Sequence, residues 1–330
     1  MCRRTAFDEI QLKYSGVPNA SLAHPDPFQP FSGTASVKSN VHAAVETLAA
    51  YAVDTVKYGP WSFLAAVRVD DYKGEYTNSV PSRQFLHDAV VMPSYKGAII
   101  YSVTPSLNGY AAYGTSFDPS AEGLSLSGAT AGLGPERSHS IEMGLKWNAT
   151  EGLLVSGALF RTIMSNMREP SPIDPTVDVL EGTGQAEGFD LQAQGQIMPG
   201  WPILAGYTYL DGRVVHSPNP DSGAALQNAP RHNLRLWTTH DLPLGFAVGA
   251  GMNYQSSRVP ASLPDANGYF QKVPGYWTGS AMLRHALTDH LSAQLNVTNI
   301  TDTYYYDGLD DNHVELGAGR TVMLTISANY

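Results

Sequence analysis

Two groups of residues in this chain have side chains that could support metal or catalytic chemistry. The first group lies in the last long polar segment and comprises Asp307, Asp310, Asp311, His313 and Glu315. Imidazole nitrogens and carboxylate oxygens can coordinate a divalent cation. Acidic residues in a polar segment are usually solvated charges, however, so the sequence predicts no metal site there.

The second group consists of the neighbours Arg137, Ser138 and His139 and the pair Arg231 and His232. These residues resemble fragments of a hydrolytic site, in which a nucleophile needs a base and an orienting group within hydrogen-bond reach. No G-x-S-x-G turn surrounds Ser138, so nothing presents its hydroxyl as a nucleophile. The sequence therefore predicts no catalytic residue, no enzyme activity and no directly bound cofactor.

The composition excludes several other classes of protein. The chain has 330 residues and a formal net charge of −10, and it has no basic stripe to neutralise the phosphates of a nucleic acid. Cys2 is the only cysteine, so no internal disulfide or thiolate metal site can form. No stretch approaches the roughly 20 apolar residues of a transmembrane helix. Frequent glycine and few charges favour a strand-rich chain with many turns.

Short turn segments recur along the chain at intervals of about 45 residues, and longer polar segments separate them. The short turns lie at 58–60, 104–106, 149–152, 198–200, 241–245 and 287–290. The longer segments, rich in Gly and Pro, lie around 76–85, 119–136, 169–182, 218–230, 260–275 and 308–319. This alternation predicts an antiparallel barrel with one short rim and one elaborate rim, as in membrane β-barrels.

Between the turns, apolar and polar residues alternate with the period of a β-strand. In the run from 141 to 149, one face carries Ile, Met, Leu, Trp and Ala, whereas Glu142 and Lys146 lie on the other face. Such runs extend for about ten residues, which suits a tilted membrane strand better than a globular strand of about five or six. A charge on a lipid face would cost about 2–4 kcal/mol, so the uncharged face predicts contact with lipid and a wet interior opposite.

Aromatic residues near strand ends give a second indication of a membrane. The tryptophans within a few residues of a short turn are Trp61, Trp147, Trp201 and Trp237. Rings with one polar edge concentrate at membrane interfaces, so these residues and the C-terminal Tyr330 are predicted to form an interfacial girdle. The alternative is that the tryptophans cap the core of a soluble protein.

About thirteen alternating runs can be counted, the first near 47–58 and the last near 321–330. Complete bacterial barrels have an even number of strands, so we predict a partial barrel over residues 41–330. Residues 1–40 contain several prolines and are predicted to be a loop that leads into the first strand. Because the first residues lack the apolar core of a secretory signal, we expect the chain to be part of a longer exported product.

Several segments, taken in order, resemble the C-terminal half of the barrel of a TonB-dependent siderophore receptor. They are Tyr51 to Thr55, Leu64 to Asp70, Leu133 to Ser138, Glu142 to Lys146, Ala158 to Arg161, Gly188 to Leu191, Asn228 to His232, Asn296 to Asp302 and Tyr304 to Tyr306. No single segment is diagnostic, and their order along the chain carries the resemblance. The family usually ends in Phe, where this chain has another aromatic residue, Tyr330.

The resemblance implies an all-β, antiparallel transmembrane β-barrel with about 13 of 22 strands present and the N-terminal plug absent. It implies a receptor of the bacterial outer membrane that imports ferric siderophores with energy from the TonB complex, which would be contacted only through the missing N-terminal region. It also implies contact with outer-membrane lipid and with the barrel assembly machinery. Iron would arrive already wrapped by the siderophore, so no metal ligand from the protein is needed.

Ligand contacts are expected at inner-facing positions close to the long-loop rim. Extending the strand at 291–305 places Asp302, Tyr304 and Tyr306 there. The strand at 245–258 adds Asn253 and Gln255. Aromatic and amide groups together suit an aryl-bearing, oxygen-rich iron chelate. The alternative for Tyr304 and Tyr306 is a place in the outer aromatic girdle.

Two other functions are compatible with the alternation. A passive porin or a structural barrel would show the same pattern without any energy coupling. A soluble propeller also repeats at about 40–45 residues, but each of its blades uses four short strands, whereas each interval here holds two long ones. A partial sheet exposes unpaired backbone groups at two edges, so we expect the isolated chain to aggregate unless further strands complete it.

Overall fold

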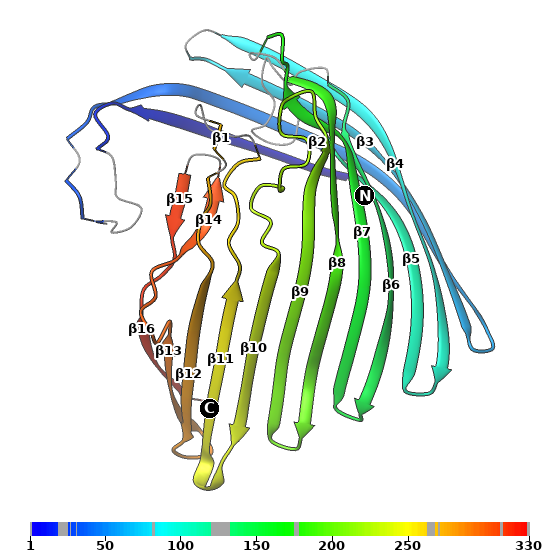
Figure 1. Cartoon of the computed structure of the whole chain (residues 1–330), viewed down its shortest axis with the longest axis vertical. Helices are drawn as coiled ribbons and strands as arrows, with labels where there is room; N and C mark the ends of the chain where they lie inside the picture. Colours follow the sequence, from blue (N-terminus) through cyan, green and yellow to red (C-terminus); the bar gives the residue numbers. More distant parts are fainter. Residues whose placement is uncertain are drawn as a thin grey trace.

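The computed structural model describes residues 2–18, 26, 28–30, 32–80, 83–119, 133–174, 178–262, 268–269, 271–310 and 313–328. Over these residues the chain forms one 14-stranded antiparallel sheet, in which each strand pairs with the next one along the chain up to β13, which pairs with β16. The sheet curves strongly and stays open, with β1 and β16 as its edge strands (Figure 1). This confirms the predicted fold, a partial antiparallel barrel.

The strands of the main sheet are long and follow one another closely. They are β1 (Cys2–Tyr14), β2 (Ala35–Tyr58), β3 (Trp61–Asn78), β4 (Gln84–Thr104), β5 (Leu107–Asp118), β6 (Glu136–Thr150), β7 (Leu153–Pro170), β8 (Asp178–Met198), β9 (Trp201–His216), β10 (His232–Asp241), β11 (Phe246–Gln255), β12 (Tyr276–Ala286), β13 (Leu291–Thr298) and β16 (Thr321–Ala328). A separate hairpin of β14 (Tyr306–Asp310) and β15 (His313–Leu316) precedes β16. Within the described ranges, no helix is both long and apolar enough to cross a membrane.

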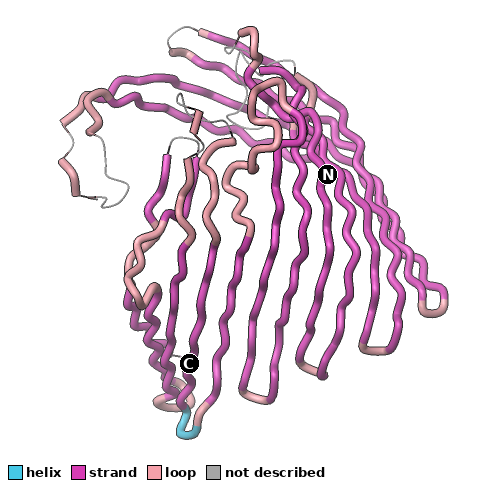
Figure 2. The backbone as a smooth tube through the Cα atoms, viewed as in Figure 1, coloured by secondary structure: helices cyan, strands magenta, loops and turns pink. Residues whose placement is uncertain are grey.

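The predicted difference between the two rims is present. Tight connections join strands at one rim, and long connections join them at the other rim (Figure 2). At the short rim, Tyr58 pairs with Trp61 across a turn in which Gly59 has φ 56°, and Gly200, between β8 and β9, has φ 76°. Glycine takes this left-handed conformation without steric cost, which allows the chain to reverse within two residues.

The two faces of the sheet differ as the alternation predicts. We call the face that carries Ile141, Met143 and Leu145 the outer face, and these side chains are 53%, 53% and 54% exposed. No second layer of the described chain covers them. On β3, the outer face is apolar from Trp61 to Val69 and becomes charged from Asp71 onwards. The opposite, inner face is polar over most of its area.

One part of the inner face is buried near the long-loop rim. Val41, Ala43, Tyr72, Tyr76 and Met92 form a small core on β2, β3 and β4. Phe7 of β1 packs against this core and pairs with Ala43. This core holds the ends of β1, β2, β3 and β4 together at the long-loop rim.

The prediction of a loop over residues 1–40 is wrong for Cys2–Tyr14, which form strand β1, and for residues 35–40, which begin strand β2. This strand pairs with β2 from Cys2 opposite Leu48 to Tyr14 opposite Ala35. Its alternation is masked in the sequence because charged residues occupy much of its outer face, while Phe7 supplies the apolar contact on the inner face. The thirteen predicted runs all fall on β2 to β13 and β16, so the main sheet gains one strand.

Candidate ligand-binding site

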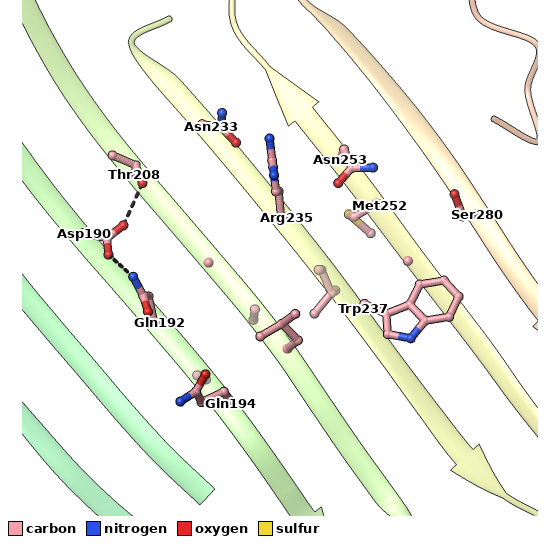
Figure 3. A pocket seen from close by; sticks show the side chains of 16 residues that line it. Asp190, Gln192, Gln194, Thr208, Asn233, Arg235, Trp237, Met252, Asn253 and Ser280 are labelled. Atoms are coloured by element: carbon pink, nitrogen blue, oxygen red, sulfur yellow. Dashed lines mark hydrogen bonds between the residues drawn. The ribbon is translucent and has the colours of Figure 1, made fainter. Parts of the chain in front are cut away.

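A hollow with a volume of about 490 Å³ lies on the inner face of β8 to β12 (Figure 3). Cross-strand pairing places its polar side chains side by side, because directly paired residues point to the same face of a sheet. Asp190 pairs with Thr208, and Thr208 pairs with Asn233. In the next row towards the short rim, Arg235 pairs with Asn253. The hollow is therefore lined by polar groups from adjacent strands.

The carboxylate of Asp190 is held by two neighbours. The Thr208 hydroxyl donates a 2.7 Å hydrogen bond to Oδ1 of Asp190, and the Gln192 amide donates to Oδ2 (Figure 3). These bonds fix the carboxylate against the wall and leave the guanidinium of Arg235 as an open cation in the hollow. Within the described part of the chain, no carboxylate lies within 4.0 Å of this guanidinium.

The indole of Trp237 forms the lower wall of the hollow, on the side of the short rim. It lies across Gly249 and Gly251, and a Cβ at Gly251 would be 2.5 Å from Cε3 of Trp237 and 2.7 Å from the carbonyl oxygen of Leu236. Glycine is therefore required at position 251 for the ring to lie flat. At Gly206, by contrast, a Cβ would meet nothing within 4 Å, so that glycine opens the hollow.

A second hollow of about 230 Å³ adjoins the first on the side of the long loops. Arg235, Asn233 and Asn253 line both. Tyr276 and Tyr305 close it with ring centroids 4.4 Å apart. Burial, and then the nearby Asp307, raise the pKa of the Tyr305 phenol, so this side chain remains a neutral donor.

Gln255 contributes an unusual group to the second hollow. Its Oε1 atom is buried and accepts no hydrogen bond from the described residues. A buried acceptor without a donor costs about 1–3 kcal/mol, and a ligand donor relieves that cost only when the side chain turns this oxygen into the hollow.

Arg258 holds the loops that position Tyr305. Its side chain is 7% exposed, and its guanidinium donates to Oδ1 of Asn228 at 2.7 Å and to the carbonyl oxygens of Tyr306 and Asp307. The backbone of Arg258 pairs with Val273. Connections from three separate places along the chain therefore meet at one guanidinium.

Two of the five predicted ligand residues line these hollows, and the other three do not. Asn253 lines both hollows, and Gln255 lines the second. Asp302, Tyr304 and Tyr306 do not line either one. Their predicted register is wrong, because β13 ends at Thr298 and does not continue to residue 305. A role for these three residues in ligand binding stays a prediction.

The turn after β13 explains the change of register. Asn299 and Asp302 have φ values of 49° and 52°, which interrupt an extended strand. Asp302 accepts a 2.8 Å hydrogen bond from the backbone N–H of Arg320, the residue just before β16. Tyr304 is 81% exposed, and Tyr305 takes the inward position instead. The sequence shows three consecutive tyrosines, and only the turn geometry selects among them.

The aromatic girdle also requires a correction. Trp61, Trp147 and Trp201 lie on the outer face, and their place at a membrane interface stays a prediction. Trp237 lies on the inner face, opposite Leu204 and Gly251. Nearness to a turn does not determine the face, because the side-chain period along a strand is two. Tyr330 lies outside the described residues.

Sequence reasoning missed a pair of outer aromatics at the opposite rim. Tyr254 pairs with Trp277, and their rings stack at 4.3 Å. Trp277 is 52% exposed. Tyr254 shares the period of two in β11 with Val248 and Met252, so the signal is present in the sequence.

The residues considered for other chemistry are not assembled into sites. Among the described residues, no three His, Cys, Asp or Glu side chains lie close enough to hold a metal ion. Ser138 pairs its hydroxyl with that of Ser116 at 2.6 Å, and the neighbouring His139 points to the opposite face, against Tyr113. Asp311 and the side chains of Asp310 and His313 lie outside the description.

Comparisons with known proteins agree with this architecture. The family model described as TonB dependent receptor-like, beta-barrel matches residues 7–300. The chain is similar to the probable TonB-dependent receptor BfrD of Bordetella pertussis, with 33% identity over 94% of this chain and 44% of BfrD. It is also similar to the catecholate siderophore receptor Fiu of Escherichia coli, with 26% identity over 95% of this chain and 46% of Fiu.

Solved structures show the same fold. The closed form of the ferric-catecholate import receptor Fiu from E. coli superposes with a TM-score of 0.82 and 24% identity over 100% of this chain and 51% of that chain. The siderophore receptor PiuA from Acinetobacter baumannii gives a TM-score of 0.81 at 25% identity over 93% of this chain and 46% of that chain. The chain spans about half the length of the curated relatives it matches. The match over residues 7–300 shows that the chain belongs to the TonB-dependent receptor-like β-barrel family.

Proposed function

We propose that this chain forms part of the barrel wall of an outer-membrane receptor that imports ferric siderophores, driven by TonB in the complete receptor. The family consists of transport receptors, and we propose no enzymatic activity for this member. The inner-face hollow, in which one open cation stands among aromatic and amide groups, carries the proposal. The named activities of Fiu and PiuA support it.

The outer face supports the proposed location. Leu145, Leu191 and Tyr207 continue one apolar row across β6, β8 and β9, and Leu145 and Leu191 are each more than half exposed. Exposed rows of this kind are unstable in water and stable against acyl chains. Outer-membrane lipid is therefore the proposed contact of this face, and insertion would use the barrel assembly machinery.

The chemistry of the hollow fits a ferric chelate with aryl groups. A ferric catecholate is anionic, and Arg235 supplies a positive charge to the hollows. Asp190 and Asp307 also line them, but neither carboxylate lies within 4.0 Å of the Arg235 guanidinium. Trp237, Tyr276 and Tyr305 offer ring faces and edges for stacking, and the Gln255 carbonyl can accept a hydrogen bond. We therefore propose catecholates as the first siderophore class to test, the class that the name of Fiu carries.

The test uses the complete receptor with Arg235→Gln, produced in a bacterium that lacks its other siderophore receptors. We expect chelate affinity to fall about ten- to hundredfold, because a hydrogen bond to a charged group contributes about 1.5–3 kcal/mol. Arg284→Gln is the matched control, since Arg284 also lies on the inner face but is paired with Asp241 at 3.7 Å. Radiolabelled ferric chelate gives both binding at low temperature and energy-dependent uptake.

The results separate the proposed receptor from a passive barrel. Saturable chelate binding, with uptake that stops when TonB is removed, supports the proposal. Free passage of small sugars into proteoliposomes without chelate binding contradicts it and assigns a porin. Equal chelate affinity in Arg235→Gln and Arg284→Gln would remove the hollow from the binding site.

A further inference from the structure

Two carboxylates are buried at the long-loop rim, where the β7–β8 and β9–β10 connections meet. Glu169, near the end of β7, is 8% exposed, and Asp221, in the β9–β10 connection, is 2% exposed. Asn219 joins the two connections, because its side-chain amide donates to the carbonyl oxygen of Pro170 at 3.0 Å and to the Glu169 carboxylate. The two acids therefore belong to one contact between segments that are distant along the chain.

Neither acid has a partner of positive charge. Every lysine and arginine of the chain lies within the described ranges, and none of their charged nitrogens comes within 4.0 Å of Glu169 or Asp221. Oδ1 of Asp221 is buried and accepts no hydrogen bond from the described residues. A buried acceptor without a donor costs about 1–3 kcal/mol, and a second buried carboxylate adds repulsion.

The other charged groups around Glu169 do not supply the missing partner. Arg168, its neighbour on β7, is engaged by Glu136 of β6 at 3.0 Å and by Asp118 of β5 at 3.5 Å. Glu136 and Asp178 of β8 act on Glu169 as further negative charges. The guanidinium beside the pair is therefore already occupied, and the remaining charges favour the uptake of a cation or a proton.

A proton suits this pair better than a metal ion does. Among the described residues, no three His, Cys, Asp or Glu side chains come together at one place, whereas a shared proton needs only two oxygens. Bound to Glu169, a proton neutralises that carboxylate and provides the donor that Oδ1 of Asp221 lacks. In agreement with this, burial, and then Asp221, raise the pKa of the Glu169 carboxyl.

The β9–β10 connection links this pair to the second hollow. After Asp221, residues 223–226 form backbone hydrogen bonds with the end of β9. The side chain of Asn228 then accepts the 2.7 Å hydrogen bond from Arg258, whose guanidinium also holds the two carbonyl groups that follow Tyr305. A change of order at Asp221 therefore reaches Tyr305 through one short connection and one guanidinium.

We propose that Glu169 and Asp221 share one proton, which holds the β9–β10 connection against the β7–β8 connection and thereby keeps Tyr305 in place at the second hollow. In a mildly acidic medium, the O–H of Glu169 donates to Oδ1 of Asp221. As the pH rises, the proton passes to water, the two buried carboxylates repel each other, and the connection loosens. Chelate retention then depends on the acidity of the medium, a regulation that rests on the proposed function.

The test measures amide hydrogen exchange of residues 217–231 in the complete receptor, in detergent micelles without divalent cations, at mildly acidic and at neutral pH. Exchange is expressed as a protection factor, so that the intrinsic pH dependence of amide exchange cancels. A hydrogen bond to a charged group contributes about 1.5–3 kcal/mol, so we expect protection to be about ten- to hundredfold higher in mild acid.

Glu169→Gln and Asp221→Asn each replace the shared proton with an amide donor, so both variants should keep the high protection at neutral pH. Glu181→Gln is the control, because it removes an exposed carboxylate of β8. This control should keep the pH dependence of the unmodified receptor. Heat-dependent gel migration shows that each variant is folded. The same pH dependence in all four proteins would overturn the inference. Calcium that raises protection at neutral pH as much as acid does would also overturn it, since the pair would then be a cation site.

Chelate dissociation gives a separate readout of the link to Tyr305. The rate is compared between Glu169→Gln and the unmodified receptor at each pH, so that protonation of the chelate itself cancels. We expect dissociation from the variant to be about tenfold slower at neutral pH and equal in mild acid. Equal rates at neutral pH would overturn the link to the hollow. A receptor that binds no chelate would contradict the proposed function, whereas hydrogen exchange still decides whether the proton is shared.

Discussion

Gly251 offers a sharp test of how the hollow is built. Replacing its hydrogen by a methyl group puts the new carbon 2.5 Å from Cε3 of Trp237 and 2.7 Å from the carbonyl oxygen of Leu236. The indole can rotate away, but the carbonyl belongs to the paired strand β10. Removing both close contacts therefore requires a new rotamer of Trp237 and a local shift of the β10–β11 pairing.

The cost can be estimated from these two movements. An off-rotamer side chain costs about 0.5–1.5 kcal/mol, and a weakened hydrogen bond in the ladder costs about 0.5–1.5 kcal/mol. We expect Gly251→Ala to lower the free energy of unfolding by about 1–3 kcal/mol, which is the usual range for overpacking. The displaced indole should also weaken chelate binding, because it loses its position in the hollow.

The assay is urea unfolding of the complete receptor in lipid vesicles, followed by tryptophan fluorescence, with chelate titration on the folded protein. Gly206→Ala is the matched control for the unfolding measurement, because a Cβ at Gly206 meets nothing within 4 Å. If Gly251→Ala gave the unfolding free energy of Gly206→Ala and kept the chelate affinity of the unmodified receptor, the packing of Trp237 against Gly251 would not matter and the reasoning would be refuted.

Two further predictions concern the long-loop rim. Burial, and then Asp221, raise the pKa of the Glu169 carboxyl above its usual 4.5, so the folded state binds this proton more tightly than the unfolded state and stability rises as pH falls through the raised pKa. Glu169→Gln should remove that dependence and slow amide hydrogen exchange in the β9–β10 connection, residues 217–231, at neutral pH; an unchanged pH profile would contradict it. Arg258→Ala removes the hydrogen bonds that the guanidinium donates to the carbonyls of Tyr306 and Asp307, at about 1.5–3 kcal/mol, so exchange around Tyr305 should accelerate and chelate binding should weaken. Arg258→Lys should not restore these properties, since one ammonium group cannot reproduce the geometry of the guanidinium donors. Full restoration by lysine would contradict the proposed role of Arg258 in holding these connections.

The strand pattern could be predicted because each face meets one kind of environment. The alternation around Ile141 assigns the faces correctly, and the short turns follow from glycines such as Gly59 and Gly200. Strand β1 escaped detection because its outer face carries charges such as Arg4 and Asp8, so hydrophobic alternation is weak there. Its contact through Phe7 depends on β2 and β3, which are distant in sequence.

The site was predictable only where regular strands carry it. Asn253 follows the period of β11, and the sequence places it on the inner face. Tyr305 could not be selected over its neighbours, because the positive φ values of Asn299 and Asp302 reset the register. Arg258 joins Asn228 to Asp307 across separate connections, and such long-range contacts leave no local pattern.

The central claim is that the outer face meets acyl chains while the inner face does not. Fluorophores attached at Leu191→Cys and Gln192→Cys test it directly, since these neighbours point to opposite faces of β8, and Cys2→Ser removes the exposed native thiol. The complete receptor is reconstituted in vesicles that contain brominated lipids. We predict strong quenching at position 191 and little at position 192. Equal quenching at both positions, or none at position 191, would contradict the account.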